Sequence, residues 1–237
     1  DGMLREFAVV RAESLLRIPD YLSVEEAATL PCAAVTAWDA LHVRGGLKAG
    51  ETVLILGTGG VSIFALQFAK LAGAGVLATT SSDEKARHLL ELGADAVHNY
   101  KTDPAWEDWA LAQTEKRGVD KVIEIGGAET LNRSLKATRF GGHIALIGVL
   151  TGTSAEIQTV QILRKGIRLD GIYVGSREMF AQMLATMERT KMRPVIDSTA
   201  IAALRDVVQQ SRAEKTAVIL SDVHSQPVKA LTESRLY

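Results

Sequence analysis

The middle of the chain alternates short apolar runs with longer segments whose apolar residues recur at helical spacing. The runs are apolar throughout, which is typical of strands buried on both faces. The expected strands are Thr52–Leu56, Gly75–Thr79, Ala96–His98, Asp120–Ile125, His143–Ile147 and Ile167–Val174. The expected helices are Ser62–Leu71, Asp83–Leu92, Trp106–Thr114 and Thr130–Thr138. Strands that alternate with helices predict an α/β fold with a doubly wound, parallel, six-stranded sheet.

The pattern differs on both sides of this alternation. Residues 6–10 form a short β-rich run, and Ser23 and Glu26 have capping-box spacing before a short helix. Pro31 begins or interrupts a second helix. The elements expected after Gly175 are the amphipathic helix Arg177–Lys191, the extended segment Arg193–Ile196, the helix Ala200–Ser211, the strand Ala217–Leu220 and a loose tail over Asp222–Tyr237.

Composition narrows the class of protein. The 237 residues are 47% hydrophobic and 23% charged, which are values for a folded domain. A net charge of -1 gives no electrostatic reason to expect nucleic acid or an anionic membrane, and a single Cys excludes a disulfide framework. No apolar run approaches the ~20 residues of a membrane span, and no signal peptide is visible. We expect a cytoplasmic protein of about one and a half domains.

The turn after the first strand is the most informative segment. It runs Leu56-Gly57-Thr58-Gly59-Gly60-Val61-Ser62. Gly57 permits a tight turn, Gly59 lets the main chain approach a pyrophosphate, and the following helix N-terminus offers N–H groups to that anion. Ser62 replaces the third glycine of the dinucleotide-binding pattern and is still small. A Walker loop is excluded because no Gly-Lys-Ser/Thr follows; a plain glycine turn and a methyltransferase turn are the alternatives.

The end of the second strand bears on the cofactor. NAD enzymes place an acid there for the ribose 2′-hydroxyl. This chain has Thr79-Thr80-Ser81-Ser82-Asp83-Glu84-Lys85, so no acid stands at the strand end. The hydroxyls and Lys85 can hold a 2′-phosphate instead. Alternatively, residues 81–84 are a capping box, Lys85 is solvated, and the two acids repel a phosphate. The missing acid favours NADP, with NAD still open.

Several segments together resemble the medium-chain dehydrogenase/reductase superfamily. These are Thr29-Leu30-Pro31-Cys32-Ala33-Ala34-Val35-Thr36-Ala37-Trp38, residues 47–62, Leu92-Gly93-Ala94-Asp95 with Asn99-Tyr100, Gly118-Val119-Asp120 and residues 141–148. The nearest branches are the zinc-type alcohol dehydrogenase-like and quinone oxidoreductase-like proteins. The resemblance covers roughly residues 1–197.

The resemblance implies two domains with the active site between them. Residues 1–31 correspond to the end of a GroES-like substrate domain, residues 32–175 to the NAD(P)-binding Rossmann domain, and residues 176–237 to a return segment plus irregular tail. The main body of the substrate domain then lies outside this chain. The implied activity is hydride transfer between NAD(P)H and a small carbonyl, alcohol, quinone or enone. A homodimer through the sheet edge near Ile172 is also implied.

Candidate cofactor contacts come from the glycine turn, the end of the second strand and the resemblance. They are Thr36, Gly57, Thr58, Gly59, Gly60, Val61, Thr80, Ser81, Ser82, Lys85, Tyr100, Gly126, Ile147, Gly148, Val149, Tyr173, Val174 and Gly175. The resemblance places Thr36 and the main chain of 147–149 and 173–175 beside the nicotinamide, and Tyr100 near the adenosine. No catalytic residue is assigned.

Cys32 stands where zinc-dependent members of this superfamily have their third metal ligand. The other two ligands, an earlier Cys and the His of a Gly-His-Glu motif, do not occur in this sequence. One thiol does not hold catalytic zinc, so we expect no zinc and interpret Cys32 as a small packing residue. Two alternatives remain: a zinc-dependent alcohol dehydrogenase whose other ligands lie upstream, and a catalytically silent NADP-binding fragment.

Overall fold

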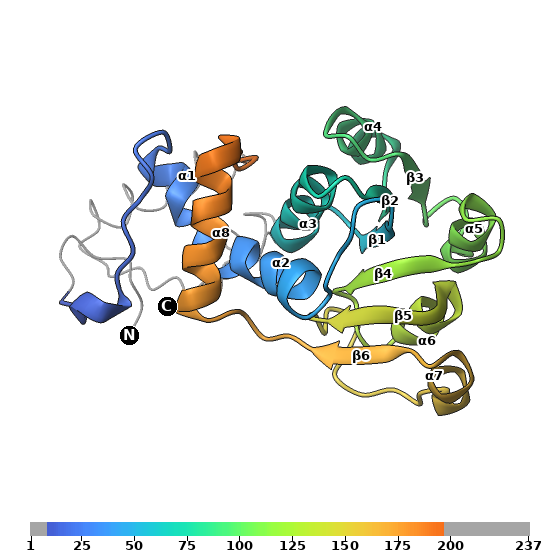
Figure 1. Ribbon diagram of the computed structural model, residues 1–237. Coiled ribbons are helices and arrows are strands. Elements are labelled where there is room, and N and C mark those ends of the chain that lie inside the picture. Colours follow the sequence, from blue (N-terminus) through green and yellow to red (C-terminus); the bar gives the residue numbers. More distant parts are fainter. Residues whose placement is uncertain (1–8, 197–237) are drawn as a thin grey trace, which may run out of the picture.

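The computed structural model describes residues 9–196. The helix expected over 200–211, the strand expected over 217–220 and the expected tail lie outside the described residues. Within them, one parallel sheet forms the centre of the molecule (Figure 1). Its strands are β1 Thr52–Leu56, β2 Gly75–Thr80, β3 Ala96–Asn99, β4 Val119–Glu124, β5 Thr138–Leu146 and β6 Arg168–Gly171.

The strand order is β3-β2-β1-β4-β5-β6, and each neighbouring pair is parallel. The chain moves outward from β1 to β3, then returns to the other side of β1 and continues to β6. This is the doubly wound arrangement, so the predicted fold class is confirmed. The direction of winding reverses between β1 and β4, which is where open α/β sheets bind ligands. The predicted domain boundaries at 31/32 and 175/176 stay predictions.

Helices cover both faces of the sheet. The described helices are α1 Val24–Ala28, α2 Val35–Trp38, α3 Gly60–Leu71, α4 Asp83–Glu91, α5 Trp106–Gln113, α6 Leu131–Ala137, α7 Thr159–Lys165 and α8 Arg177–Thr190, of which α1 and α8 lie to the side of the sheet (Figure 1). A 3-10 turn spans Ala12–Ser14, and π-helical turns at Leu30–Ala34 and Asp39–Val43 flank α2.

Two apolar cores explain why the strands are apolar throughout. Val53 and Ile55 of β1 belong to a core on the face covered by α2, α3 and α4, where Phe68 is fully buried. Leu54 belongs to a second core with α5 and α6 on the opposite face, where Leu135 is fully buried. Successive residues of a strand point to opposite faces, so a strand between two helical layers needs an apolar residue at every position.

The two ends of the described chain are joined beside α8, where Figure 1 shows α1 as its neighbour. The capping box at Ser23 is confirmed, since Glu26 N–H donates to Ser23 Oγ over 3.2 Å and Ser23 N–H donates to Glu26 Oε2 over 2.7 Å. Arg193 then pairs with Glu26 at 2.9 Å, and the Tyr21 hydroxyl donates to the Met192 carbonyl over 2.8 Å. These contacts join segments far apart in the sequence.

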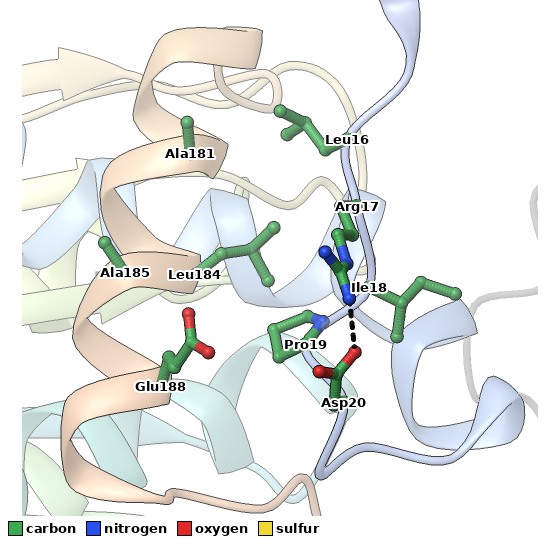
Figure 2. Close-up of a pocket in the computed structure, with 9 residues that line it drawn as sticks. All are labelled: Leu16, Arg17, Ile18, Pro19, Asp20, Ala181, Leu184, Ala185 and Glu188. Atoms are coloured by element: carbon green, nitrogen blue, oxygen red, sulfur yellow. Dashed lines mark hydrogen bonds and ion pairs between the residues drawn. The ribbon is translucent and has the colours of Figure 1, made fainter.

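A hollow of about 360 Å³ lies between the segment Leu16–Asp20 and α8 (Figure 2). Leu184 and Glu188 line it from α8, and Leu16 and Pro19 line it from the other segment. Its charged residues are exposed, as in the Arg17–Asp20 pair at 2.9 Å.

The structure corrects four sequence-based expectations about secondary structure. Helix α7 was not predicted, because a short helix with no buried residue leaves no apolar face in the sequence. β6 ends at Gly171 rather than Val174, since the chain then leaves the sheet edge for α8. β5 begins at Thr138, because the glycines at 141–142 continue the strand instead of preceding it. Residues 9–10 of the expected N-terminal β-rich run form no strand.

His143 lies inside β5, with Nε2 3.0 Å from Asp170 Oδ2. Burial, with the positive charge of Arg168, lowers the pKa of His143 to about 4. The unfolded chain binds a proton near the ordinary pKa of 6.5 and the folded chain resists it, so acid favours unfolding.

We expect the free energy of unfolding to fall as the pH drops from 6.5 toward 4, and His143→Gln to flatten this slope. One proton that binds to the unfolded chain and not to the folded chain changes the free energy of unfolding by about 1.4 kcal/mol per pH unit. Urea unfolding at several pH values measures it, with His88→Gln as the exposed-histidine control. An unchanged slope in His143→Gln would contradict the assignment.

Candidate functional site

The loops after β1, β4 and β5 meet at one edge of the sheet, at the reversal point between β1 and β4. A Cβ atom built on Gly57, after β1, would lie 3.6 Å from Ile125 Cδ1, after β4. A Cβ built on Gly148, after β5, would lie 2.0 Å from the Ile125 carbonyl oxygen. The structure therefore brings the glycine turn together with Gly126 and with Ile147–Val149. No side chain larger than hydrogen fits at Gly148 without moving the main chain.

The glycine turn leaves the start of α3 without a side-chain cap. Gly57 has φ +72°, a left-handed conformation that favours glycine, and its N–H donates to the Thr79 carbonyl over 2.9 Å. Gly59 is the N-cap residue, and no described side chain caps the helix. The first N–H groups of a helix have no partner within it and carry partial positive charge. A Cβ on Gly60 would lie 3.2 Å from Ala33 Cβ, so the π-helical turn closely covers this end.

Ser62 explains why the glycine pattern tolerates a serine. Its side chain is fully buried, and its hydroxyl donates to the Leu56 carbonyl over 2.7 Å. Leu56 is the last residue of β1, so this bond ties the first turn of α3 to the strand end. The small residue expected here both packs closely and satisfies its own polar group.

The ends of β2 and β3 form a second cluster beside the turn. Tyr100 N–H donates to the Thr80 carbonyl over 3.0 Å, so the two candidate residues lie together. Thr80 Oγ1 is buried and makes no hydrogen bond within the described part of the chain. Ser81 and Ser82 are half-buried, and Lys85 is exposed on the first turn of α4.

The capping interpretation of this segment needs one correction. Ser82, not Ser81, is the N-cap residue of α4, and its Oγ accepts from Lys85 N–H over 3.3 Å. Asp83 is held by Asn99, whose amide donates to Asp83 Oδ1 over 2.7 Å. This bond connects β3 to the first turn of α4 and limits where the Asp83 carboxylate lies.

The residues expected beside the nicotinamide are brought together only in part. Thr36 is buried on α2, and its hydroxyl donates to the Cys32 carbonyl over 2.6 Å. A Cβ on Gly175 would lie 2.6 Å from Val35 Cγ2. Gly175 therefore packs against Val35, the residue that precedes Thr36 in the sequence. Val174 is half-buried against the core. The Tyr173 side chain, however, is fully solvent-accessible and does not join this group.

Glu124 is a residue that the sequence reasoning missed. It ends β4, is fully buried, and its Oε1 accepts from the N–H groups of Gly126 at 2.8 Å and Gly127 at 3.0 Å. The apolar run around it indicates only one more strand position. The signal was available, because an acid inside a continuously apolar run and just before two glycines needs hydrogen-bond donors if it is buried.

Cys32 does not pack as expected. It lies exposed in the π-helical turn Leu30–Ala34, which corrects its interpretation as a buried apolar residue. Within residues 9–196, no three His, Cys, Asp or Glu side chains are grouped to hold a metal ion. The described residues alone therefore do not fit a zinc site. In the same part of the chain, no helix has the length and apolar character needed to cross a membrane.

Comparison with known proteins decides the family. Residues 60–189, more than half of the chain, match the family model described as zinc-binding dehydrogenase. The chain belongs to the zinc-binding dehydrogenase family. A zinc-type alcohol dehydrogenase-like protein of Schizosaccharomyces pombe is 45% identical over 203 residues, which cover 83% of this chain and 59% of that protein. The chain thus spans about three fifths of the length of this relative.

Solved structures of the same architecture carry both kinds of nicotinamide cofactor in their names. An NAD-dependent alcohol dehydrogenase is 33% identical, with a TM-score of 0.71 over 81% of this chain and 57% of its own. A 2-octenoyl-CoA carboxylase reductase in complex with NADP is 29% identical, with a TM-score of 0.69 over 76% of this chain and 44% of its own. Relatives of this family member are therefore NAD(P)-dependent oxidoreductases.

Proposed function

We propose that this chain binds NADP(H) along the carboxyl edge of its sheet and takes part in hydride transfer to or from a small carbonyl, alcohol, quinone or enone. The observation that carries the proposal is the uncapped start of α3 after a left-handed Gly57, at the reversal point of the sheet. Fluorescence titration with NADPH tests it. Saturable binding at one site is expected, and the absence of binding would contradict it.

Each part of the edge has a proposed role. The N–H groups of Gly60 and Val61 bind the pyrophosphate with the partial positive charge of the α3 N-terminus. The loops at 126–127 and 147–149 hold the nicotinamide half and exclude water from one side of it. The cofactor supplies the hydride, and the protein supplies orientation. We propose this activity for the whole protein, and the chain spans 59% of the length of its relative.

The preference for NADP over NAD rests on the end of β2. No acid stands there, and beside the buried Thr80 hydroxyl, Ser81, Ser82 and exposed Lys85 offer hydroxyls and a positive charge to a 2′-phosphate. The neighbouring carboxylate of Asp83 is held by Asn99. NAD is the alternative, in which ribose hydroxyls occupy this cluster.

Reversing the charge at Lys85 tests the preference. We expect Lys85→Glu to raise the dissociation constant of NADPH by about tenfold and to leave that of NADH within about twofold, because only NADPH carries the 2′-phosphate. Arg87→Glu, at another exposed position of α4 on a different side of the helix, is the charge-matched control. Equal weakening of both cofactors by Lys85→Glu would contradict a phosphate contact.

A zinc-dependent alcohol dehydrogenase with its other metal ligands outside this chain is the second candidate. The exposure of Cys32 favours it, because an exposed thiol is accessible to a metal ion. Metal analysis of the longer protein, with Cys32→Ser as comparison, separates the two. Metal-free protein with full oxidoreductase activity would exclude zinc. NADPH binding without turnover of any quinone, enone, aldehyde or alcohol would instead favour a catalytically silent fragment.

We also propose a homodimer through the β6 edge of the sheet. β6 is an edge strand, and exposed edges are commonly covered in natural proteins. Tyr173, two residues after its end, is 95% exposed, and Leu150 and Leu163 are 65% and 81% exposed. We further propose a cytoplasmic location, because a chain with a single cysteine cannot form the intramolecular disulfides that are typical of oxidising compartments.

Charge placed next to this edge is expected to dissociate the dimer. Tyr173→Asp should shift the mass measured by light scattering from twice that of the chain to that of one chain, because a buried carboxylate without a partner disfavours the interface. Phe140→Asp, at an exposed position of β5, is the control that should stay dimeric. A wild-type chain that is monomeric at high concentration would contradict this assembly.

A further inference from the structure

Glu124 lies directly behind the loops proposed to hold the nicotinamide half of the cofactor. Its side chain has no solvent exposure. Oε1 accepts from the N–H groups of Gly126 and Gly127 and, at 2.6 Å, from the Thr130 hydroxyl. Oε2 accepts from the Ser134 hydroxyl. One carboxylate therefore joins the end of β4, the loop that follows it and α6.

The loop held in this way has no space for a side chain at either of its glycines. A Cβ on Gly126 would lie 2.2 Å from Thr130 Oγ1, and a Cβ on Gly127 would lie 2.9 Å from the Gly148 carbonyl oxygen. Gly127 also has φ +92°, in the left-handed region. Main chain thus packs directly on main chain between the loop after β4 and the loop after β5.

The main chain of Glu124 continues this connection to the loop after β5. Its carbonyl accepts from Ile147 N–H over 2.8 Å and from Gly148 N–H over 3.2 Å. Thr151 N–H donates to the Gly126 carbonyl over 2.8 Å. The loop after β5 is therefore bonded both to the end of β4 and to Gly126 of the loop after β4.

We propose that Glu124 is a positioning residue for the nicotinamide half of the cofactor. Its carboxylate fixes residues 126–127 and, through them, the main chain of 147–149 against which the ring binds. This inference rests on the proposed function. A displacement of about 1 Å in a binding loop is enough to weaken a correctly oriented complex strongly. The adenosine half binds at the end of β2, outside this hydrogen-bond network.

Two variants of Glu124 and two ligands test the proposal. The ligands are NADPH and adenosine 2′,5′-bisphosphate, which lacks the nicotinamide half. We expect Glu124→Ala to raise the dissociation constant of NADPH at least about tenfold, since it removes several hydrogen bonds that hold the loop. Glu124→Gln keeps an acceptor for Gly126 and Gly127 and should stay within about threefold. Both variants should bind adenosine 2′,5′-bisphosphate like the wild type.

The outcomes separate the inference from the proposed function. Equal weakening of both ligands by Glu124→Ala, or no weakening of NADPH, would overturn the positioning role. Failure of the wild-type chain to bind NADPH would instead overturn the proposed function. If Glu124→Ala does not fold, Thr130→Val removes one donor and keeps the carboxylate. We then expect a loss of about threefold for NADPH alone, and a loss shared by both ligands would overturn the inference.

Discussion

Gly59→Asp is expected to abolish cofactor binding while leaving the fold at least as stable. Gly59 is the N-cap of α3, with φ -72° and ψ 168°, a conformation that any residue adopts. An aspartate there caps the helix and contributes a few tenths of a kcal/mol to its stability relative to glycine. The same carboxylate occupies the N–H groups proposed for the pyrophosphate and repels it. We expect the dissociation constant of NADPH to rise at least about a hundredfold.

Gly59→Asn separates the two effects of that substitution. Asparagine caps the helix about as well as aspartate but carries no charge, so its loss of affinity should be smaller. Titration with NADPH measures the affinity, and thermal unfolding measures the stability of each variant. Unchanged NADPH affinity in Gly59→Asp would contradict a pyrophosphate site at this turn. Lower thermal stability would contradict an open N-cap.

Asp120→Ala is expected to have the opposite profile, with lower stability and unchanged cofactor affinity. Asp120 is 3% exposed near the start of β4, away from the carboxyl edge of the sheet. Its Oδ2 accepts from Thr52 N–H over 2.9 Å and from Arg117 over 2.7 Å, and Arg139 donates to Oδ1. Because both arginines are partly exposed, we expect a cost of about 2–3 kcal/mol, at the low end for a buried pair.

The stability that Asp120 contributes through Arg117, Arg139 and Thr52 N–H depends on pH with a defined sign. Burial alone would raise the pKa of Asp120, but the hydrogen bonds from Arg117, Thr52 N–H and Arg139 outweigh it and hold that pKa well below its usual range. The stabilisation is therefore present above the ordinary pKa near 3.8 and is lost below it. Urea unfolding at neutral pH measures the loss in Asp120→Ala, with exposed Asp103→Ala as control. A loss equal to that of Asp103→Ala would contradict the account.

The sheet could be predicted from the sequence because burial on both faces leaves an uninterrupted apolar run. Leu54 and Ile55 face different cores, yet both must be apolar. The glycine turn could be predicted because Gly57 needs a left-handed conformation that few residues adopt. In both cases a local physical requirement appears directly in the residue type.

The remaining features depend on contacts between distant residues. Ser134 meets Glu124 across ten positions, and Arg193 meets Glu26 across 167, so no local pattern records either contact. The exposure of Cys32 depends on a π-helical turn that propensity does not predict. α7 has no buried residue, so its helical spacing leaves no amphipathic signal. The sequence therefore predicts the carboxyl edge of the sheet as the candidate site but does not predict the buried carboxylate of Glu124 behind it.

Mapping backbone amide shifts during an NADPH titration tests the central claim most directly. With the ¹⁵N-labelled chain, the account predicts that the largest changes fall on the glycine turn at 57–61, on the loops at 126–127 and 147–149, and on residues 80–85. These segments are joined at one edge of the sheet. Changes confined to another surface, such as the hollow between Leu16–Asp20 and α8, would contradict it.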